Sequence, residues 1–138
     1  MIIDANFKGL KQIQNGDYVF EGNLESKETI EIHLDDRFVI KGSIITEKSI
    51  IAECGIEAGY GIEAGEGIEA GWGIKAGEGI EAGWGIKAGY GIEAGFRIFA
   101  GVATYHSSKN CIKTISCKRL IKGEIAFGEL IERGEKDG

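Results

Sequence analysis

Histidine and cysteine are the side chains of this chain best suited to catalysis or metal binding. His106 and Cys111 are close in sequence, and a His–Cys pair can form a nucleophile or part of a metal site. Their spacing matches no strong motif of either kind. His33 alternates with Ile32 and Leu34, so we expect it to face outward. The sequence therefore predicts a protein that is not an enzyme and has no cofactor or metal. The alternative is an enzyme or ligand-binding domain that uses His106 and Cys111.

Glycine-rich strings also suggest phosphate-binding loops, but here they belong to a longer pattern. Residues 55–96 read Gly-Ile-(Glu or Lys)-Ala-Gly-X seven times in succession, and the chain contains no GxxxxGK[ST] motif. A fixed short period is typical of one small structural unit stacked on copies of itself. The glycines therefore indicate architecture rather than phosphate chemistry.

The local pattern of each hexad fits a short β-strand. Ile and Ala would point to one side and the intervening Glu or Lys to the other. A period of six does not match the helical repeat, and each Gly would cost a helix roughly 1 kcal/mol. Because Gly tolerates positive φ, we expect the Gly-X-Gly strings to form the corners. The sequence predicts an all-β, single-stranded parallel β-helix with Ile and Ala inside.

The hexad phase can be followed beyond the obvious repeats. It holds over residues 31–102, with Ile32 and Leu34 occupying the inward positions of the first hexad, so we predict the solenoid there. Residues 1–30 are expected to form an N-terminal β cap. Residues 103–138 are expected to contain a loop, a C-terminal β segment that either continues or caps the solenoid, and a flexible tail. All three parts are expected to form one folded unit.

Two closures of the solenoid are sensible, with either two or three hexads in each coil. Two hexads would stack Glu57, Glu69, Glu81 and Glu93 into one acidic column, whereas three would place Lys75 between Glu57 and Glu93. Like charges stacked about 4.8 Å apart are unfavourable. Two hexads would also build an aromatic ladder, and three would pair Trp72 with Tyr90. We prefer three sides, with about 18 residues per coil and a height of about 19 Å for four coils.

Charge and cysteine content indicate which partners and which cellular compartment to expect. The net charge is −6, yet residues 109–122 carry five bases and no acid. The acidic balance makes nucleic-acid binding an unfavoured function, and no long apolar run or signal-peptide core indicates a membrane. The three cysteines form no even disulfide set, which is typical of reduced thiols. We expect a soluble, cytoplasmic protein.

Aromatic residues end five of the seven repeats, and regularly spaced exposed aromatics can form a binding surface for a sugar or a protein. Acidic side chains of the repeats and two basic residues after them complete our candidate surface. Its members are Tyr60, Trp72, Trp84, Tyr90, Phe96, Glu57, Glu69, Glu81, Lys118 and Arg119.

The run FVIKGSIITEKSIIAECGIEAGYGIEAG resembles the repeats of bactofilins and related polymer-forming β-helix proteins. The shared feature is an aliphatic residue every six positions, and the resemblance covers roughly residues 31–102. It implies end-to-end self-assembly, which extensive non-repeat ends would block if they are caps. Hexapeptide solenoids also include acyltransferases with a catalytic His, but residues 37–102 contain none.

The short, acidic chain with a repetitive array also resembles in style small phage and mobile-element proteins, including anti-CRISPR inhibitors. Our leading hypothesis is a non-catalytic β-solenoid that binds a protein partner, as a phage-type inhibitor of a bacterial defence (CRISPR-Cas) complex in the host cytoplasm. A homodimer is expected. A self-assembling, bactofilin-like scaffold is the alternative.

Overall fold

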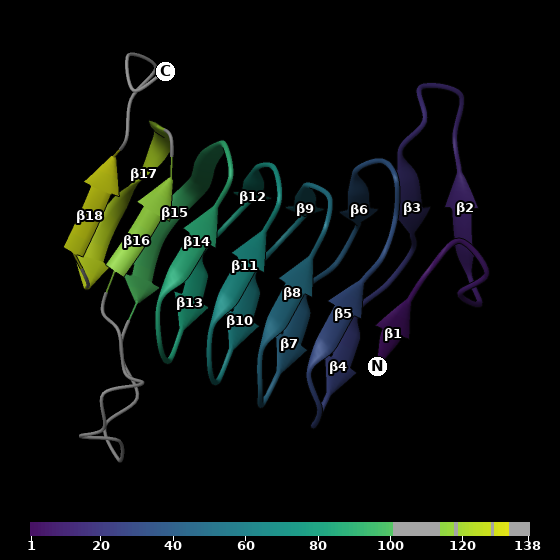
Figure 1. The fold of residues 1–138 in the computed structure, drawn as a ribbon, viewed down its shortest axis with the longest axis horizontal. Helices are drawn as coiled ribbons and strands as arrows, with labels where there is room; N and C mark the ends of the chain where they lie inside the picture. The colour runs from purple at the N-terminus through teal and green to yellow at the C-terminus, as the bar shows by residue number, and fades with distance from the viewer. Residues whose placement is uncertain (101–113, 118, 128, 133–138) are drawn as a thin grey trace.

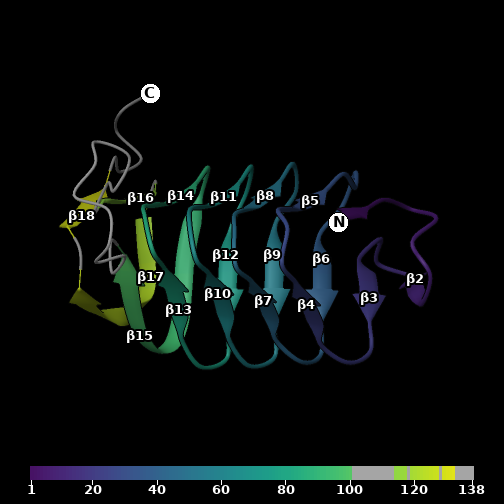
Figure 2. The same ribbon diagram turned by 90° about the horizontal axis from the view of Figure 1, so that it is seen from below.

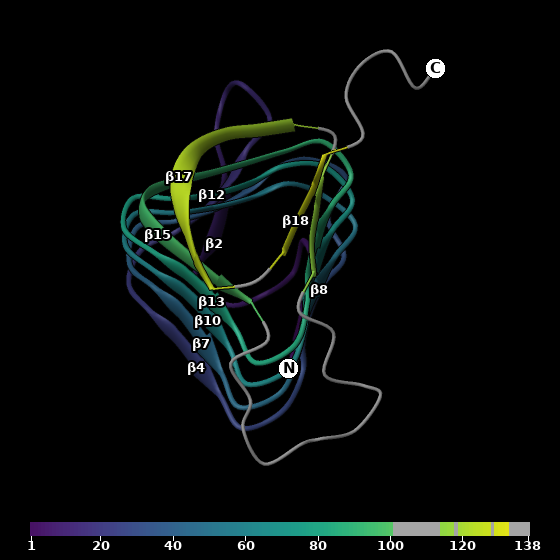
Figure 3. The same ribbon diagram turned by 90° about the vertical axis from the view of Figure 1, so that its left-hand side faces the viewer.

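A computed structural model describes residues 1–100, 114–117, 119–127 and 129–132. They form an all-β parallel solenoid of about five turns with about 18 residues per turn (Figure 1). The end-on view shows the coils as a three-sided outline (Figure 3). The described ranges contain only strands and their connections, so no helix among them could cross a membrane.

Three strands make up one turn, and successive turns stack as regular rungs (Figure 2). The first four turns comprise β3 (Tyr18–Phe20), β4 (Leu24–Ser26), β5 (Ile30–Ile32), β6 (Phe38–Ile40), β7 (Ile44–Thr46), β8 (Ile50–Ala52), β9 (Ile56–Ala58), β10 (Ile62–Ala64), β11 (Ile68–Ala70), β12 (Ile74–Ala76), β13 (Ile80–Ala82) and β14 (Ile86–Ala88). The ends comprise β1 (Ile2–Ile3), β2 (Leu10–Gln12), β15 (Gly91–Ala100), β16 (Thr114–Cys117), β17 (Arg119–Phe127) and β18 (Glu129–Glu132).

The register confirms the predicted three-sided closure, with about 18 residues per coil. Ile74 pairs with Ile56 on one side and with Ile92 on the other, in parallel strands. On the outer surface of the same strands, Lys75 lies between Glu57 and Glu93. Charge alternation along this column therefore favours the three-sided closure, as opposite charges on neighbouring strands attract.

The core is a column of isoleucines and small residues inside the coils. In the repeats every Ile is 0–1% exposed and every Ala is 0–3% exposed, while the residue between them faces outward. This alternation confirms the predicted inward and outward faces. Burying one isoleucine side chain contributes roughly 1.5–3 kcal/mol, so the stack of isoleucines is the main source of stability.

The corner glycines are needed for a different reason from the one predicted. Among the described residues positive φ occurs only at Gly9, Gly16 and Gly22, all upstream of the repeats. At the first glycine of most repeat corners, a Cβ would instead approach the carbonyl oxygen of the preceding coil closer than 3.0 Å. At Gly77, for example, the obstructing atom is the Gly59 oxygen. The coils stack so closely at these points that only a hydrogen atom fits.

The solenoid begins upstream of the predicted boundary at residue 31. β3, β4 and β5 pair in parallel with β6, β7 and β8, so residues 18–32 form the first turn and residues 18–30 are not part of a cap. Residues 1–17 contribute β1, which pairs in parallel with β5, and β2, which pairs antiparallel with β3. Phe7 and Leu10 of this segment pack against the core cluster.

The hexad phase slips between the first and second turns. The inward pair of β5 is Ile30 and Ile32, not Ile32 and Leu34 as the sequence phase predicted, because Ile30 pairs with Ile50 and Ile32 with Ala52. The corner at residues 33–37 is therefore longer than the corners of the repeats. It holds the exposed His33 and the buried Leu34.

Downstream of the repeats, the C-terminal β segment continues the parallel pairing. β16 pairs with β14, and β18 pairs with β16. β17 pairs with β15, with shifts in register along the pair. Leu120, Ile125 and Leu130 are half-buried and pack against the core cluster. The predicted loop after residue 102 and the flexible tail lie mostly outside the described residues.

Candidate functional site

Each corner of the solenoid carries its own column of variable residues. Backbone N–H groups donate to the corner carbonyls of the preceding coil, from Tyr90 to Trp72 and from Phe96 to Glu78, for example. The five repeat aromatics therefore separate onto three corners instead of forming one row. One corner carries Trp72 and Tyr90, the second carries Tyr60 and Phe96, and the third carries the half-buried Trp84.

A groove of about 690 Å³ runs along the first of these corners. We call it the corner groove, and it is lined by residues 34–37, 53–57 and 72–75, together with Asp17, Tyr90, Gly91 and Glu93. The long corner at residues 33–37 supplies one end of the lining, and β9, β12 and β15 supply the adjoining face. The phase slip thus places the polar residues 35–37 beside the corner that carries Trp72 and Tyr90.

Trp72 and Tyr90 form the aromatic part of the corner groove. Their ring centroids are 6.2 Å apart and the planes are tilted by 56°, which confirms the pairing expected for three hexads per coil. Trp72 is 64% exposed and Tyr90 is 37% exposed. Such tilted pairs are favourable contacts, so the two rings hold each other in place while most of Trp72 stays exposed.

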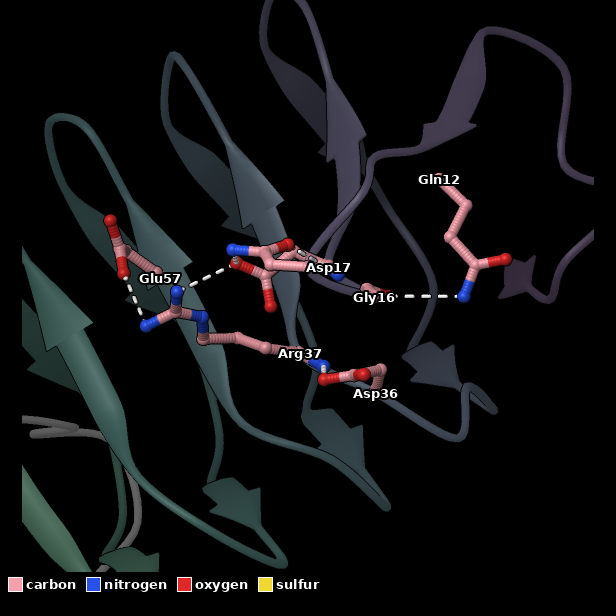
Figure 4. A network of polar contacts seen from close by, with 7 residues as sticks. Gln12, Gly16, Asp17, Asp36, Arg37 and Glu57 are labelled. Atoms are coloured by element: carbon pink, nitrogen blue, oxygen red, sulfur yellow. Dashed lines mark hydrogen bonds and ion pairs between the residues drawn. The ribbon is translucent and has the colours of Figure 1, made fainter.

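One column of charged side chains in the corner groove, Asp17, Arg37, Glu57, Lys75 and Glu93, alternates in sign along the stack. Arg37 Nη2 donates to Asp17 Oδ2 at 2.6 Å, and Arg37 Nη1 lies 3.0 Å from Glu57 Oε1 (Figure 4). The hydrogen bond to Asp17, with the charge of Glu57, raises the pKa of Arg37. Farther along, Lys75 Nζ lies 3.9 Å from Glu93 Oε2. Both cations of the described lining therefore lie beside carboxylates.

His33 lies beside the corner groove on the outer surface, as predicted. Its Nδ1 lies 3.1 Å from Glu53 and its Nε2 lies 3.2 Å from Glu31. These two hydrogen-bonding carboxylates, Glu53 first, raise the pKa of the imidazole. A His bracketed by two carboxylates in this way is an ion-pair partner at mildly acidic pH rather than a general base.

Cys54 occupies the same corner one turn before Trp72, but its thiol is buried. The residue is 3% exposed, and this burial raises the pKa of the thiol to about 11. The thiolate is the reactive form of cysteine, so Cys54 is chemically inert at neutral pH. Cys54 is a free thiol, and Cys111 lies outside the described residues.

We therefore expect native protein treated with iodoacetamide at pH 8 to remain unlabelled at Cys54. Peptide mass spectrometry would measure the modification, with the same reaction in urea as the control in which Cys54 is fully labelled. Labelling of Cys54 in the native protein at the rate seen in urea would contradict its burial.

The remaining candidate residues do not gather in one place. Glu57 lines the corner groove, Glu69 lies on a different face in register with Lys87, and Glu81 lies in register with Glu63. Arg119 is in β17, where its backbone pairs with Gly91. Lys118 and His106 lie outside the described residues.

Sequence reasoning missed Asp17, Arg37 and the acidic pair Asp35 and Asp36 as members of a site. The available signal was the break in hexad phase before Phe38, because extra residues in a solenoid coil must project at a corner. In the described ranges no three His, Cys, Asp or Glu side chains are grouped so that they could hold a metal ion.

Glu63 and Glu81 are two like-charged residues that the register places side by side on neighbouring strands. Partial desolvation and the charge of Glu63 raise the pKa of Glu81 above its usual 4.5. A raised carboxyl pKa in the folded state favours folding below the unfolded pKa, and this contribution is lost as pH rises through the folded pKa.

We therefore expect Glu81→Gln to be more stable than the unchanged protein at pH 7, by less than about 1 kcal/mol because both carboxylates are exposed. The difference should vanish below pH 4. Thermal unfolding across this pH range would measure it. Glu69→Gln is the matched control, since it removes an attraction to Lys87 and should not stabilise.

Searches of protein-family models, curated proteins and solved structures find no match to this chain. The resemblance to β-helix repeats is confirmed by the structure at the level of the fold.

Proposed function

We propose that the protein is a non-catalytic β-solenoid that binds a partner protein through the corner groove. The observation that carries this proposal is the exposed, mutually packed pair of Trp72 and Tyr90 on the wall of a groove. Aromatic side chains in grooves are typical anchors of protein interfaces, where a few of them supply most of the binding energy. A surface Trp that is 64% exposed has much apolar area to bury against a partner.

The backbone around the groove favours binding without reorganisation. Each groove-lining strand is hydrogen-bonded in parallel to strands of the coils before and after it. The corner itself continues this pattern, because the Tyr90 N–H donates to the Trp72 carbonyl at 3.0 Å. A surface held in this way loses little conformational entropy when a partner binds.

Photo-cross-linking in the cells that produce the protein would test the proposal. A benzophenone amino acid at position 72 should capture a specific partner, and Trp72→Ala should abolish co-purification of that partner. Phe96 provides the matched control, because it is 67% exposed on another corner outside the groove. Equal capture from positions 72 and 96, or unchanged co-purification with Trp72→Ala, would contradict a groove-dependent partner.

The narrower hypothesis, that the partner is a bacterial defence complex such as CRISPR-Cas and the protein is its phage-type inhibitor, stays a prediction. It expects co-expression to restore transformation by a plasmid that the defence system targets. Trp72→Ala should lose this protection and Phe96→Ala should keep it. No protection against any of several CRISPR-Cas types would argue against an anti-CRISPR role.

Self-assembly is the second candidate, favoured by the end strands of one sheet of the solenoid. β1 and β18 are the end strands of the seven-stranded sheet, and each pairs with one neighbour among the described strands. Unpaired strand edges are templates for pairing with another chain. Light scattering at high concentration would measure the assembly state. Filaments would support a scaffold, a dimer would match the expected homodimer, and a monomer would contradict both filaments and a homodimer.

The enzymatic alternative, based on His106 and Cys111, stays a prediction to be tested by the double variant His106→Ala, Cys111→Ala.

A further inference from the structure

We infer that the corner groove takes an extended segment of the partner chain that carries Arg or Lys side chains. The inference rests on the proposed function and specifies the chemistry of the partner. Its first support is charge. Among the lining residues that the structure describes, six are carboxylates and two are cations, a net charge of −4.

Each cation in the described part of the lining already has a carboxylate partner. Arg37 is held between Asp17 and Glu57, and Lys75 lies 3.9 Å from Glu93. A phosphate or carboxylate entering the groove would have to displace these carboxylates and face the remaining acidic residues. A cationic side chain would instead gain attraction from several carboxylates at once.

The aromatic pair supplies a second, independent preference for cations. Arg and Lys interact favourably with the faces of Trp and Tyr, and an Arg guanidinium does so while keeping its hydrogen bonds to carboxylates. Glu93 lines the groove together with both rings. The chain already shows this contact at another corner, where the Arg97 guanidinium lies over the Phe96 ring at 5.3 Å from its centroid.

The length of the groove favours a peptide segment over a small cation. Its lining extends from Asp17, at the start of the first turn, to Glu93 in the fifth. Five stacked strands span about 19 Å at the usual strand spacing, which an extended chain covers with roughly six residues. Side chains of such a segment would alternate toward and away from the groove, so every second residue would face the lining.

Peptide binding would test this inference with the purified full-length protein. The probe is a fluorescein-labelled Arg-Gly-Arg-Gly-Arg-Gly peptide, the charge control replaces each Arg with Gln, and cellohexaose represents a neutral sugar. We expect fluorescence anisotropy to show binding of the Arg peptide alone, weakened by added salt.

Four variants locate the site and its charge dependence. Trp72→Ala should weaken binding of the Arg peptide by about tenfold, while Phe96→Ala should leave the affinity unchanged. Lys75→Gln should tighten binding by about threefold because it makes the groove more negative, whereas Lys87→Gln, on a different face, should not. Circular dichroism of each variant would establish that it is folded.

Absence of Arg-peptide binding, equal loss in the Trp72 and Phe96 variants, or weaker binding by Lys75→Gln would each overturn the inference. Binding of cellohexaose but not of the Arg peptide would replace it with a sugar site. In a final arm, excess Arg peptide should block capture of the cross-linked partner. If capture of the partner depends on Trp72 but excess Arg peptide does not block it, the proposed function would be supported. The inference that the groove binds a cationic segment would then be rejected.

Discussion

Gly77→Ala is expected to destabilise the solenoid by more than about 3 kcal/mol, although it adds only one methyl group. The new Cβ would approach the Gly59 carbonyl oxygen of the preceding coil closer than 3.0 Å. Both atoms belong to backbone that is hydrogen-bonded to neighbouring coils, so neither can move alone. Relief would require two coils to separate at that corner, with loss of ladder hydrogen bonds such as Gly77 N–H to Ala58 O.

Gly67→Ala is the matched control for this prediction. A Cβ there would lie 3.5 Å from the nearest atom, the Gly85 oxygen, which is ordinary van der Waals contact. Neither glycine has positive φ. Gly67→Ala should therefore leave stability unchanged or increase it by about 0.5 kcal/mol, because alanine restricts the unfolded chain. Urea denaturation would measure both variants, and equal effects would show that coil spacing does not set the glycine requirement.

Ile74→Lys is expected to unfold the middle of the solenoid. Ile74 is 1% exposed and stacks between Ile56 and Ile92, so a lysine there would place a charge inside a closed apolar column. Removing a buried Ile side chain alone costs about 2–5 kcal/mol, and the unpaired charge adds to that cost. A domain of this size has only about 5–15 kcal/mol of stability to lose.

The same substitution at Ile51 is the matched control, because it introduces lysine at an outer instead of an inner position. Ile51 is 43% exposed on the outer face, and its register neighbours are Glu31 and Glu69. Ile51→Lys should therefore change stability by less than about 1 kcal/mol, with attraction to these acids partly offsetting lost apolar contact. Far-UV circular dichroism during thermal unfolding would compare the two. A similar effect of both lysines would contradict the assignment of inner and outer faces.

The three-sided fold could be predicted from the sequence because alternation and charge point to the same answer. Ile and Ala at alternate positions define the inward face of each strand, and Lys75 between Glu57 and Glu93 selects three hexads per coil. Both are local or periodic signals that depend on side-chain type alone. The extension of the solenoid to Tyr18 was missed because the phase slip after Ile32 interrupts the periodicity.

The role of the glycines could not be predicted from their type. Positive φ and close backbone approach both require glycine, and the two reasons give identical sequences. Only the stacked coils distinguish them, since they place the Gly59 oxygen against the missing Cβ of Gly77.

The sequence predicted one contact of the corner groove, the Trp72–Tyr90 pair, but not the groove itself. The period brings Trp72 and Tyr90 together, and this pairing followed from the closure alone. Arg37 and Asp17 come from turns where the sequence had lost its phase, so their position beside Glu57 had no periodic signal. The groove arises where a regular array meets an irregular corner.

A turn contains three hexads, while the sequence repeats every hexad, and this mismatch has a genetic consequence. Copying errors in a repetitive gene add or remove whole repeats, and each single hexad gained or lost rotates everything downstream by one face. Deleting one hexad between Trp72 and Tyr90 would seat Phe96 over Trp72 instead, without disturbing the isoleucine column. Lineages that gain or lose three hexads would keep the same arrangement of surface residues. Gain or loss of one or two hexads would produce a different surface on the same core.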